Sequence, residues 1–284
     1  LEGVKITVGP PYFARVFTPI AALVILMLGV GPHLPWKRAG RVAWGRLFTL
    51  GAIGAGLALG IARLTFGPGP VGAMAAFALG GWLVVLALAE WGRRLRALGG
   101  PSIFARLRRL PRAQHGMTLA HLGLAVLVFG VSAAESFTEE HLVMLAPGEV
   151  VRVGAFDVRF DGVEPVAGPN YTAIEGHFTA RRNGHVVTRL APQQRTYWAP
   201  PMETTEAAIR PFVTGDLYVV IGDPVKGRWS ARLYWKPLVG WIWIGALMIA
   251  FGGLIALSDR RLRIFARRRS RRKRRSGMKA GMAT

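Results

Sequence analysis

Apolar residues are gathered into five blocks along the chain. The blocks cover residues 16–30, 47–62, 70–89, 117–134 and 237–257, and none has an Asp, Glu, Lys or Arg in its interior. A helix needs about 20 mostly apolar residues to cross the hydrocarbon core of a bilayer. The pattern therefore predicts five transmembrane helices. The first two blocks are short and rich in glycine, so a buried helix of a soluble protein stays open there as the alternative.

The segment between the fourth and fifth blocks has a different period. Apolar and polar residues alternate over 156–160 and again over 174–180, as they do in half-buried strands. Asn183-Gly184 predicts a tight hairpin turn, and Gly222-Asp223-Pro224 predicts another turn. We expect residues 135–233 to form a small antiparallel β-sandwich or barrel.

Charge indicates how these elements are oriented across the membrane. The formal net charge is +22, and the basic residues gather within residues 37–46, 93–112 and 260–275. Five crossings place these three segments on one side, whereas residues 135–230 carry twelve acidic against nine basic residues. Because basic loops stay in the cytoplasm, the β-rich segment is predicted to lie on the outer face. Topology and contact with membrane lipid explain the charge, so no nucleic-acid partner is expected.

These patterns predict an α-helical polytopic membrane protein with a small antiparallel β-rich domain. The predicted parts are a membrane domain of four helices (1–134), the outer β-rich domain (135–233), the fifth helix (234–258) and a basic cytoplasmic tail (259–284). The chain opens at Leu1 and not at a methionine, so we expect it to be the C-terminal part of a longer protein. The absence of cysteine excludes disulfides, thiolate metal sites and a direct thiol-redox role.

His121 is the one ionisable residue inside a predicted membrane helix. Such a residue costs about 3 kcal/mol or more in the membrane, so it usually has a partner or a function. Neutral imidazole is a common ligand of haem iron. The alternative is a histidine near the membrane interface that is bonded to a backbone carbonyl or to water, and spacing alone favours this alternative.

Three glycines on the same predicted helix, Gly116, Gly123 and Gly130, recur every seven residues and leave one face without side chains. At about 100° per residue, His121 points about 160° away from Gly123. We therefore expect the glycines to admit a neighbouring helix and not a haem.

The remaining candidates have simpler explanations. His33 and His115 are expected at the membrane interface. The histidines of the outer segment are expected to have surface or structural roles: His141, His177 and His185. Three tryptophans are predicted to form an interfacial aromatic belt: Trp235, Trp241 and Trp243. The outer segment has no nucleophile elbow, HExxH motif or phosphate-binding glycine loop, so no catalytic residue is predicted.

Short segments in order along the chain carry a family resemblance. They are Val8–Val16, Gly31-Pro32 followed by Trp36, Ala120–Val126, Met144–Gly148, Gly168–Tyr171, Thr205–Ile209, Asp216–Tyr218, and Arg232–Pro237 leading to Trp241-Ile242-Trp243. Each is weak alone, but together, with the predicted helices between them, they are specific. The chain resembles the C-terminal part of the cytochrome c haem lyase subunit family that includes CcmF and NrfE.

The resemblance implies a role in cytochrome c maturation at the bacterial inner membrane. Proteins of this family accept haem at the periplasmic face from a haem chaperone. With thiol-handling chaperone subunits, they attach it to the CxxCH thiols of an apocytochrome c. The family also carries a structural haem b within its helices, and His121 falls on one of its axial ligands. The haem that is attached to the apocytochrome is the substrate.

Several parts of the family's site have no counterpart in the chain. They are the tryptophan-rich segment that holds the substrate haem, the two histidines that ligate that haem, and the second ligand of haem b. The resemblance places all of them upstream, in the N-terminal part of the same protein. The chain is therefore expected to be an incomplete part of a haem lyase (cytochrome c synthase).

Two functions of another class stay open. One is a fragment of a transporter, and the other is a non-enzymatic membrane scaffold whose outer domain recruits partners. Transporters usually carry broken helices or buried charges near mid-membrane. No predicted helix has a buried acid or base other than His121, which disfavours the transporter.

Overall fold

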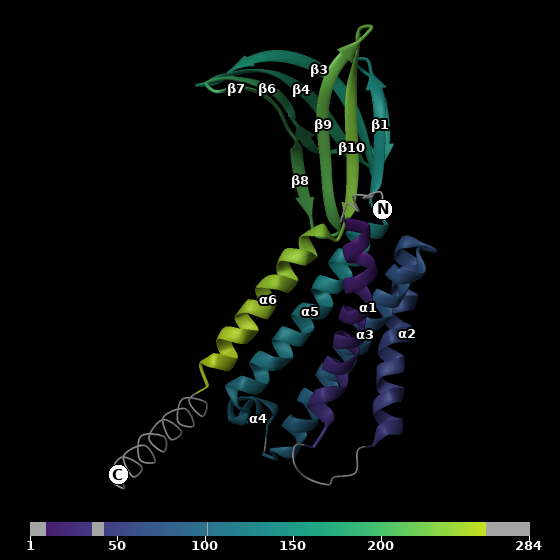
Figure 1. Cartoon of the computed structure of the whole chain (residues 1–284), viewed down its shortest axis with the longest axis vertical. Coiled ribbons are helices and arrows are strands. Elements are labelled where there is room, and N and C mark those ends of the chain that lie inside the picture. Colours follow the sequence, from purple (N-terminus) through teal and green to yellow (C-terminus); the bar gives the residue numbers. More distant parts are fainter. Residues whose placement is uncertain (1–9, 36–42, 101, 260–284) are drawn as a thin grey trace, which may run out of the picture. The chain divides into compact units, whose positions relative to one another are not determined.

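The computed structural model of the protein describes residues 10–35, 43–100 and 102–259, and it divides into two compact units (Figure 1). The helical unit consists of residues 1–67, 74–128 and 244–284, and the β unit consists of residues 68–73 and 129–243. Lys37, Arg38, Arg41 and the basic segment 260–275 lie outside the described residues.

The five predicted transmembrane helices are confirmed. The described helices are α1 (Pro10–Val30), the short 3-10 turn η1 (Gly31–His33), α2 (Trp44–Phe66), α3 (Val71–Ala97), α4 (Ile103–Arg109), α5 (Arg112–Ser136) and α6 (Val239–Leu257). All of them except η1 and α4 are long and apolar enough to cross a membrane. Ser102 caps α4, where its hydroxyl accepts a hydrogen bond from the N–H of Ala105.

Helix α3 is longer than the sequence pattern predicts. The apolar block ends at Ala89, but the helix continues to Ala97 and therefore includes Glu90, which is 1% exposed. The expectation that His121 is the only buried ionisable residue of a membrane helix is wrong. The helix continues because Arg93 and Arg94, one turn on, neutralise Glu90 from its own helix.

Glycines allow α1 and α2 to approach α3 closely. A Cβ at Gly29 would lie 2.5 Å from Trp82 Nε1, and a Cβ at Gly51 would lie 2.2 Å from Cε3 of the same indole ring. The indole N–H of Trp82 donates to the carbonyl of Leu26 over 3.3 Å. Gly54 on α2 and Gly81 on α3 approach each other directly, each against the carbonyl oxygen of the other. Small residues thus bring the backbones together, as in other membrane helix pairs.

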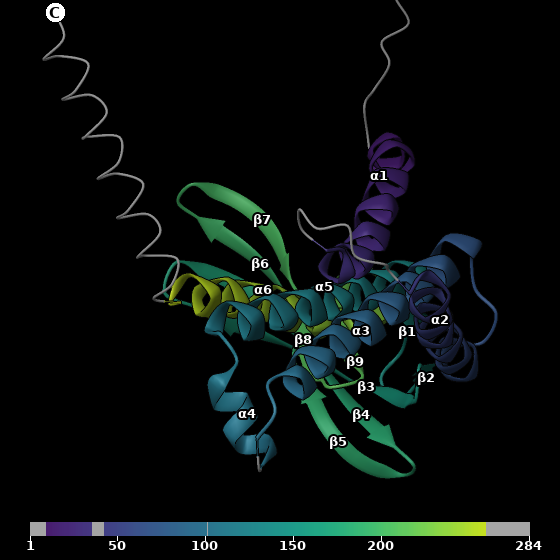
Figure 2. The same cartoon turned by 90° about the horizontal axis from the view of Figure 1, so that it is seen from below.

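The glycine face of α5 packs against α6, as expected (Figure 2). A Cβ on Gly123 would lie 2.8 Å from the carbonyl oxygen of Gly245, and one on Gly245 would lie 2.6 Å from that of Gly123. The same reciprocal contact joins Gly116 and Gly252. Two heptad-spaced glycines on each helix therefore face each other.

The β unit contains two antiparallel sheets, in agreement with the predicted sandwich (Figure 1). One has the order β1-β10-β9-β8 and the other the order β2-β3-β4-β6-β7, with β5 paired to β4. The strands are β1 (Glu139–Leu145), β2 (Val150–Val153), β3 (Phe156–Ala167), β4 (Tyr171–Arg182), β5 (His185–Leu190), β6 (Gln193–Trp198), β7 (Pro201–Glu206), β8 (Ala208–Phe212), β9 (Gly215–Val225) and β10 (Arg228–Pro237).

The alternating apolar residues fill one core between the two sheets. Phe156, Val158 and Phe160 on β3 are at most 1% exposed, and they pack with Leu217 and Leu233 from the other sheet. The two inner faces meet because successive side chains of a strand point to opposite faces.

One of the two predicted turns is correct and the other is wrong. Asn183 and Gly184 have φ of 50° and 80° and form the β4–β5 hairpin, as predicted. Gly222-Asp223-Pro224 is not a turn, because β9 continues through it to Val225. The turn lies at Lys226-Gly227, where φ is positive at both residues. The residues Gly222–Pro224 instead lie where the register between β9 and β10 shifts, opposite Ser230.

Candidate functional site

His121 lies on α5 and is half-buried. Its Nδ1–H donates to the carbonyl oxygen of Met117, one turn earlier, over 2.7 Å. Because Nδ1 faces an acceptor, it carries the proton, and the lone pair lies on Nε2. Nε2 makes no hydrogen bond to any residue that the structure describes. The ring is therefore held in one tautomer with its other nitrogen open.

Both ring nitrogens are engaged in the other two histidines of the helical unit. His115 accepts a hydrogen bond from Trp91 Nε1 on Nδ1 over 3.2 Å and donates from Nε2 to Leu107 O over 3.1 Å. His33 donates from Nε2 to Leu86 O over 3.1 Å, and its Nδ1 lies 3.4 Å from Glu90. His121 alone of the three therefore has a ring nitrogen open to a further ligand.

The helix geometry also separates His121 from the α5–α6 contact. Gly123 faces α6, and His121 is rotated about 160° from it. His115 marks a second face, which contacts Trp91 on α3. His121 lies on a third face, rotated about 120° from that of His115. The ring of His121 thus lies on neither the face of α5 that contacts α6 nor the face that contacts Trp91 of α3.

This arrangement fits one axial ligand of a haem. A haem ligand needs a neutral imidazole with a free nitrogen, and a hydrogen bond from the other nitrogen fixes the ring and raises its basicity. The carbonyl oxygen of Met117 accepts such a bond from Nδ1. The bond to a backbone carbonyl agrees with the alternative explanation of His121 in the sequence, and it leaves Nε2 without a bond to any described residue, so the prediction of a haem ligand stays open.

The sequence reasoning missed a polar cluster around Glu90. The Glu90 carboxylate accepts from Arg93 Nε and Nη2, each over 2.7 Å, and from Arg94 Nε. His33 Nδ1 lies 3.4 Å from the same carboxylate. The signal was present in the sequence, since Glu90 precedes two arginines at the helical spacings i+3 and i+4. It was missed because Glu90 follows the last residue of the apolar block.

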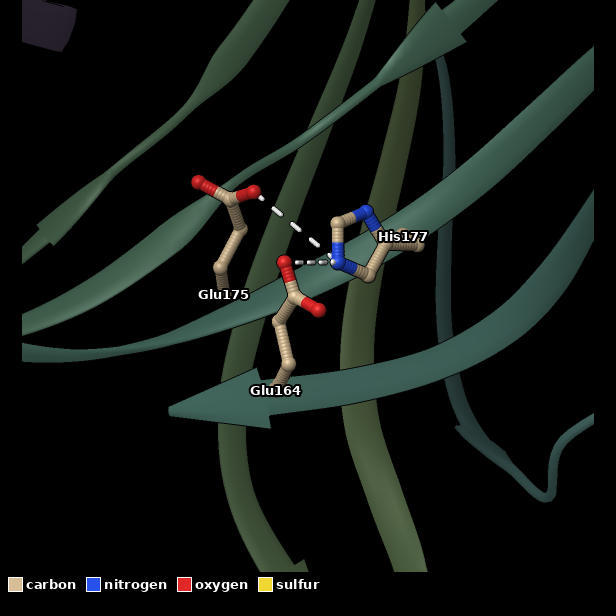
Figure 3. A group of neighbouring side chains, drawn as sticks. All are labelled: Glu164, Glu175 and His177. Carbon is tan, nitrogen blue, oxygen red and sulfur yellow. Dashed lines mark ion pairs between the residues drawn. The ribbon is translucent and has the colours of Figure 1, made fainter. Parts of the chain in front are cut away.

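A second group of titratable side chains lies on the β unit. Figure 3 shows Glu164 on β3 and Glu175 and His177 on β4 directed toward one another. His177 Nε2 lies 3.1 Å from Glu164 and 3.9 Å from Glu175. Glu164 and Glu175 are direct cross-strand partners, and Gln193 donates to Glu175. The two carboxylates repel each other across the strands. A protonated imidazole between them would offset that repulsion.

One of the three tryptophans expected in an aromatic belt packs against the β core. Trp235 is partly buried there, and its ring centroid lies 5.4 Å from that of Phe156. Trp241 donates its indole N–H to Val213 O over 3.0 Å. Trp243 is 73% exposed. The belt stays a prediction for Trp241 and Trp243.

The chain is similar in sequence to known proteins over most of its length. Residues 136–237 match the family described as "CcmF C-terminal beta-sandwich". The chain is 41% identical over 275 residues to the cytochrome c-type biogenesis protein CycK of Rhizobium meliloti (strain 1021), covering 95% of this chain and 40% of that protein. It is 36% identical over 273 residues to CcmF of Pseudomonas aeruginosa, covering 95% and 41%.

A solved structure agrees with the sequence matches. The structure named Cytochrome c Heme Lyase CcmF superposes with a TM-score of 0.69 at 25% identity, over 88% of this chain and 41% of that one. Of this chain, residues 136–237 are the part that matches a C-terminal domain of CcmF. It spans about 40% of the length of the curated relatives it matches. The match covers both the membrane helices and the β unit, so the resemblance seen in the sequence is confirmed.

Proposed function

We propose that the chain is the C-terminal portion of a membrane haem lyase component that acts in cytochrome c biogenesis. The observation that carries the proposal is the open Nε2 of His121, on a ring held by Met117 O. The likeness of almost the whole chain to CycK and CcmF supports it. The reaction proposed for the whole protein is covalent attachment of haem to an apocytochrome, and the name of the similar structure, Cytochrome c Heme Lyase CcmF, supports this proposal.

In this proposal His121 binds the iron of a resident haem b through Nε2. When bound, that haem would supply one-electron chemistry, as a carrier that passes electrons to the iron of the substrate haem. Met117 O would keep the His121 ring in the tautomer that ligates, and the glycine contact holds α5 close to α6. The second ligand and the substrate site are proposed to come from the N-terminal part of the same protein.

The β unit is proposed to lie in the periplasm and to act as a docking or lid element for the partners. These are the haem chaperone, the apocytochrome c and the thiol-handling subunits. Attachment of haem to two thiols depends mainly on holding the vinyl groups and thiols together. The cysteine-free chain cannot trap the thiols of the apocytochrome in mixed disulfides.

Maturation of a c-type cytochrome in cells tests the proposal. The full-length protein that contains this chain would be expressed in a bacterium whose own homologue is deleted, and covalent haem on the cytochrome would be measured on denaturing gels. We expect His121→Ala to abolish the haem signal and His115→Ala to retain most of it. Deletion of residues 140–228 should also abolish the signal while haem b is retained. Unchanged maturation in the His121 variant would overturn the assignment.

A further inference from the structure

A cavity of about 540 Å³ lies in the helical unit where the ends of three membrane helices meet. His33 follows the end of α1, Arg46 lies in the first turn of α2, and Arg93 and Arg96 lie in the last turns of α3. All four line the cavity. The haem-ligand candidate His121 is not among its lining residues.

The positive charge of this cavity exceeds its negative charge. Glu90 is the one acidic group bonded to a lining arginine among the described residues, and Arg93 and Arg94 already neutralise it. Arg46 and Arg96 form no ion pair with any described residue. At least two guanidinium groups therefore line the cavity without a counter-charge among the described residues.

One arginine is held in place before any ligand arrives. Glu90 is 1% exposed and binds Arg93 through both Nε and Nη2, so Nη1 is left for a ligand. Arginine held by a buried carboxylate loses little side-chain entropy when it binds an anion. Glu90 is thus a positioning residue for Arg93.

The start of α2 adds a second source of positive potential. Its N-cap residue Ala43 lines the cavity, no side chain caps the helix, and the first turn has no acidic residue. The first backbone N–H groups of such a helix attract an anion. Arg46 stands in this same turn, where a cation is unfavourable unless an anion is present.

Part of the cavity wall is apolar. Leu47 and Leu50 on α2 and Ala89 on α3 line it. A free phosphate ion would leave this wall in contact with water, whereas a phospholipid would cover it with its glycerol and acyl chains. A pocket lined by both basic and apolar side chains, at the end of membrane helices, matches the two parts of an anionic lipid.

We propose that the cavity bounded by Arg46, Arg93, Arg96 and His33 binds the phosphate of an anionic phospholipid headgroup, with the lipid's apolar part against Leu47, Leu50 and Ala89. The site is separate from the proposed haem ligand and does not depend on it. Its contribution is to anchor the ends of α1, α2 and α3 at the membrane surface.

Native mass spectrometry of the full-length protein tests this proposal. The detergent-solubilised protein would be titrated with phosphatidylglycerol and, in parallel, with phosphatidylcholine. We expect the wild type to prefer phosphatidylglycerol, and we expect the double substitution Arg46→Gln and Arg96→Gln to reduce that preference about tenfold or more. The matched control is Arg108→Gln with Arg109→Gln on α4, which removes the same charge outside the cavity and should change little. An equal loss in both variants would mean diffuse attraction and would overturn the site.

Two further arms separate the alternatives. Glu90→Gln raises the net positive charge but frees Arg93, so the proposal expects weaker lipid preference, whereas diffuse attraction predicts stronger preference. Inorganic phosphate is then added as a competitor. If millimolar phosphate displaces phosphatidylglycerol completely, the site recognises phosphate alone, and the assignment to a lipid is wrong. Because the readout is lipid binding and not haem, its failure leaves the proposed function untouched.

Discussion

The helical unit and the β unit differ in how their own elements pack: one depends on small residues and the other on large side chains. In the β unit, large side chains such as Phe156, Phe160 and Phe178 are almost fully buried in one continuous core. In the helical unit, the tightest contacts are made where side chains are absent, at glycine pairs. Helix α6 is the extreme case, since only 11% of its apolar stretch is buried inside the protein.

This difference follows from the surroundings of each unit. In water, burial of apolar surface stabilises a fold, so large side chains in a core are favourable. In a membrane, apolar side chains gain little by leaving lipid, and close backbone approach supplies the packing. Removal of volume should therefore damage the β unit, and addition of volume should damage the helical unit.

The largest effect is expected from added volume at Gly252. A Cβ there would lie 2.6 Å from Gly116 O and 2.7 Å from Ala120 N, both of them backbone atoms that cannot move independently. Gly252→Val should separate α5 from α6 and remove most of the monodisperse protein recovered by size-exclusion chromatography in detergent. The neighbouring Gly253 has open space around it, so Gly253→Val is the matched control and should be recovered normally. Equal recovery of both variants would contradict the glycine contact.

Removal of volume from the β core should have the next largest effect. Phe160 is 0% exposed, and its ring centroid lies 5.0 Å from that of Phe178. Phe160→Ala should destabilise the β unit by about 3–5 kcal/mol. Hydrogen-exchange mass spectrometry of the full chain would detect this as faster exchange in peptides of β3 and β4. Val186→Ala, at a 52% exposed position, should leave exchange unchanged. Unchanged exchange of β3 and β4 in the Phe160→Ala variant would show that the stability of the β unit does not depend on this core.

A smaller, pH-dependent effect is expected at Asp216 in β9. Burial raises the pKa of Asp216, although the backbone N–H of Phe212 opposes the shift in part. The folded state therefore favours the protonated form. The cost of the charge is absent below the ordinary pKa of Asp, appears as pH rises toward the folded pKa, and is complete above it. Asp216→Asn should raise the melting temperature of the purified chain at pH 7 and lose that advantage at low pH. A less stable variant at pH 7 would show that attraction to a cation outweighs burial.

The smallest effect is expected at Glu149, where the sign is reversed. The N–H of Ala146 and the guanidinium of Arg228 lower the pKa of Glu149. The stability that this carboxylate contributes is present above the ordinary pKa of Glu and is lost as pH falls through the lowered folded pKa. Glu149→Gln should lower the melting temperature slightly at pH 7, and the difference should vanish in acid. An effect at pH 7 as large as that of Phe160→Ala would contradict the expectation that solvent screens the contact between Glu149 and Arg228.

The comparison also explains what the sequence could predict. The five helices, the buried side of β3 and the glycine face of α5 follow from periodicity, which local sequence carries. The site of His121 on a face away from α6 follows from helical rotation alone. These features needed no knowledge of which elements meet.

The features that were missed depend on contacts between distant residues. Gly222–Pro224 has the composition of a turn, yet its pairing in β9 is decided by β10. Glu90 lies beyond the apolar block, and its burial depends on arginines of its own helix and on His33 from the η1 turn. Trp235 was expected in an aromatic belt because it precedes α6, but Phe156 and Phe212 place it in the core.

The central claim, that His121 ligates a resident haem b through Nε2, is tested most directly by optical spectroscopy. The full-length protein that contains this chain would be purified from haem-replete cells and reduced, and its haem b absorption would be compared between the wild type, His121→Ala and His115→Ala at equal amounts of folded protein. We predict that the signal is lost or greatly reduced in His121→Ala and kept in His115→Ala. An unchanged haem b spectrum in folded His121→Ala protein would contradict the assignment.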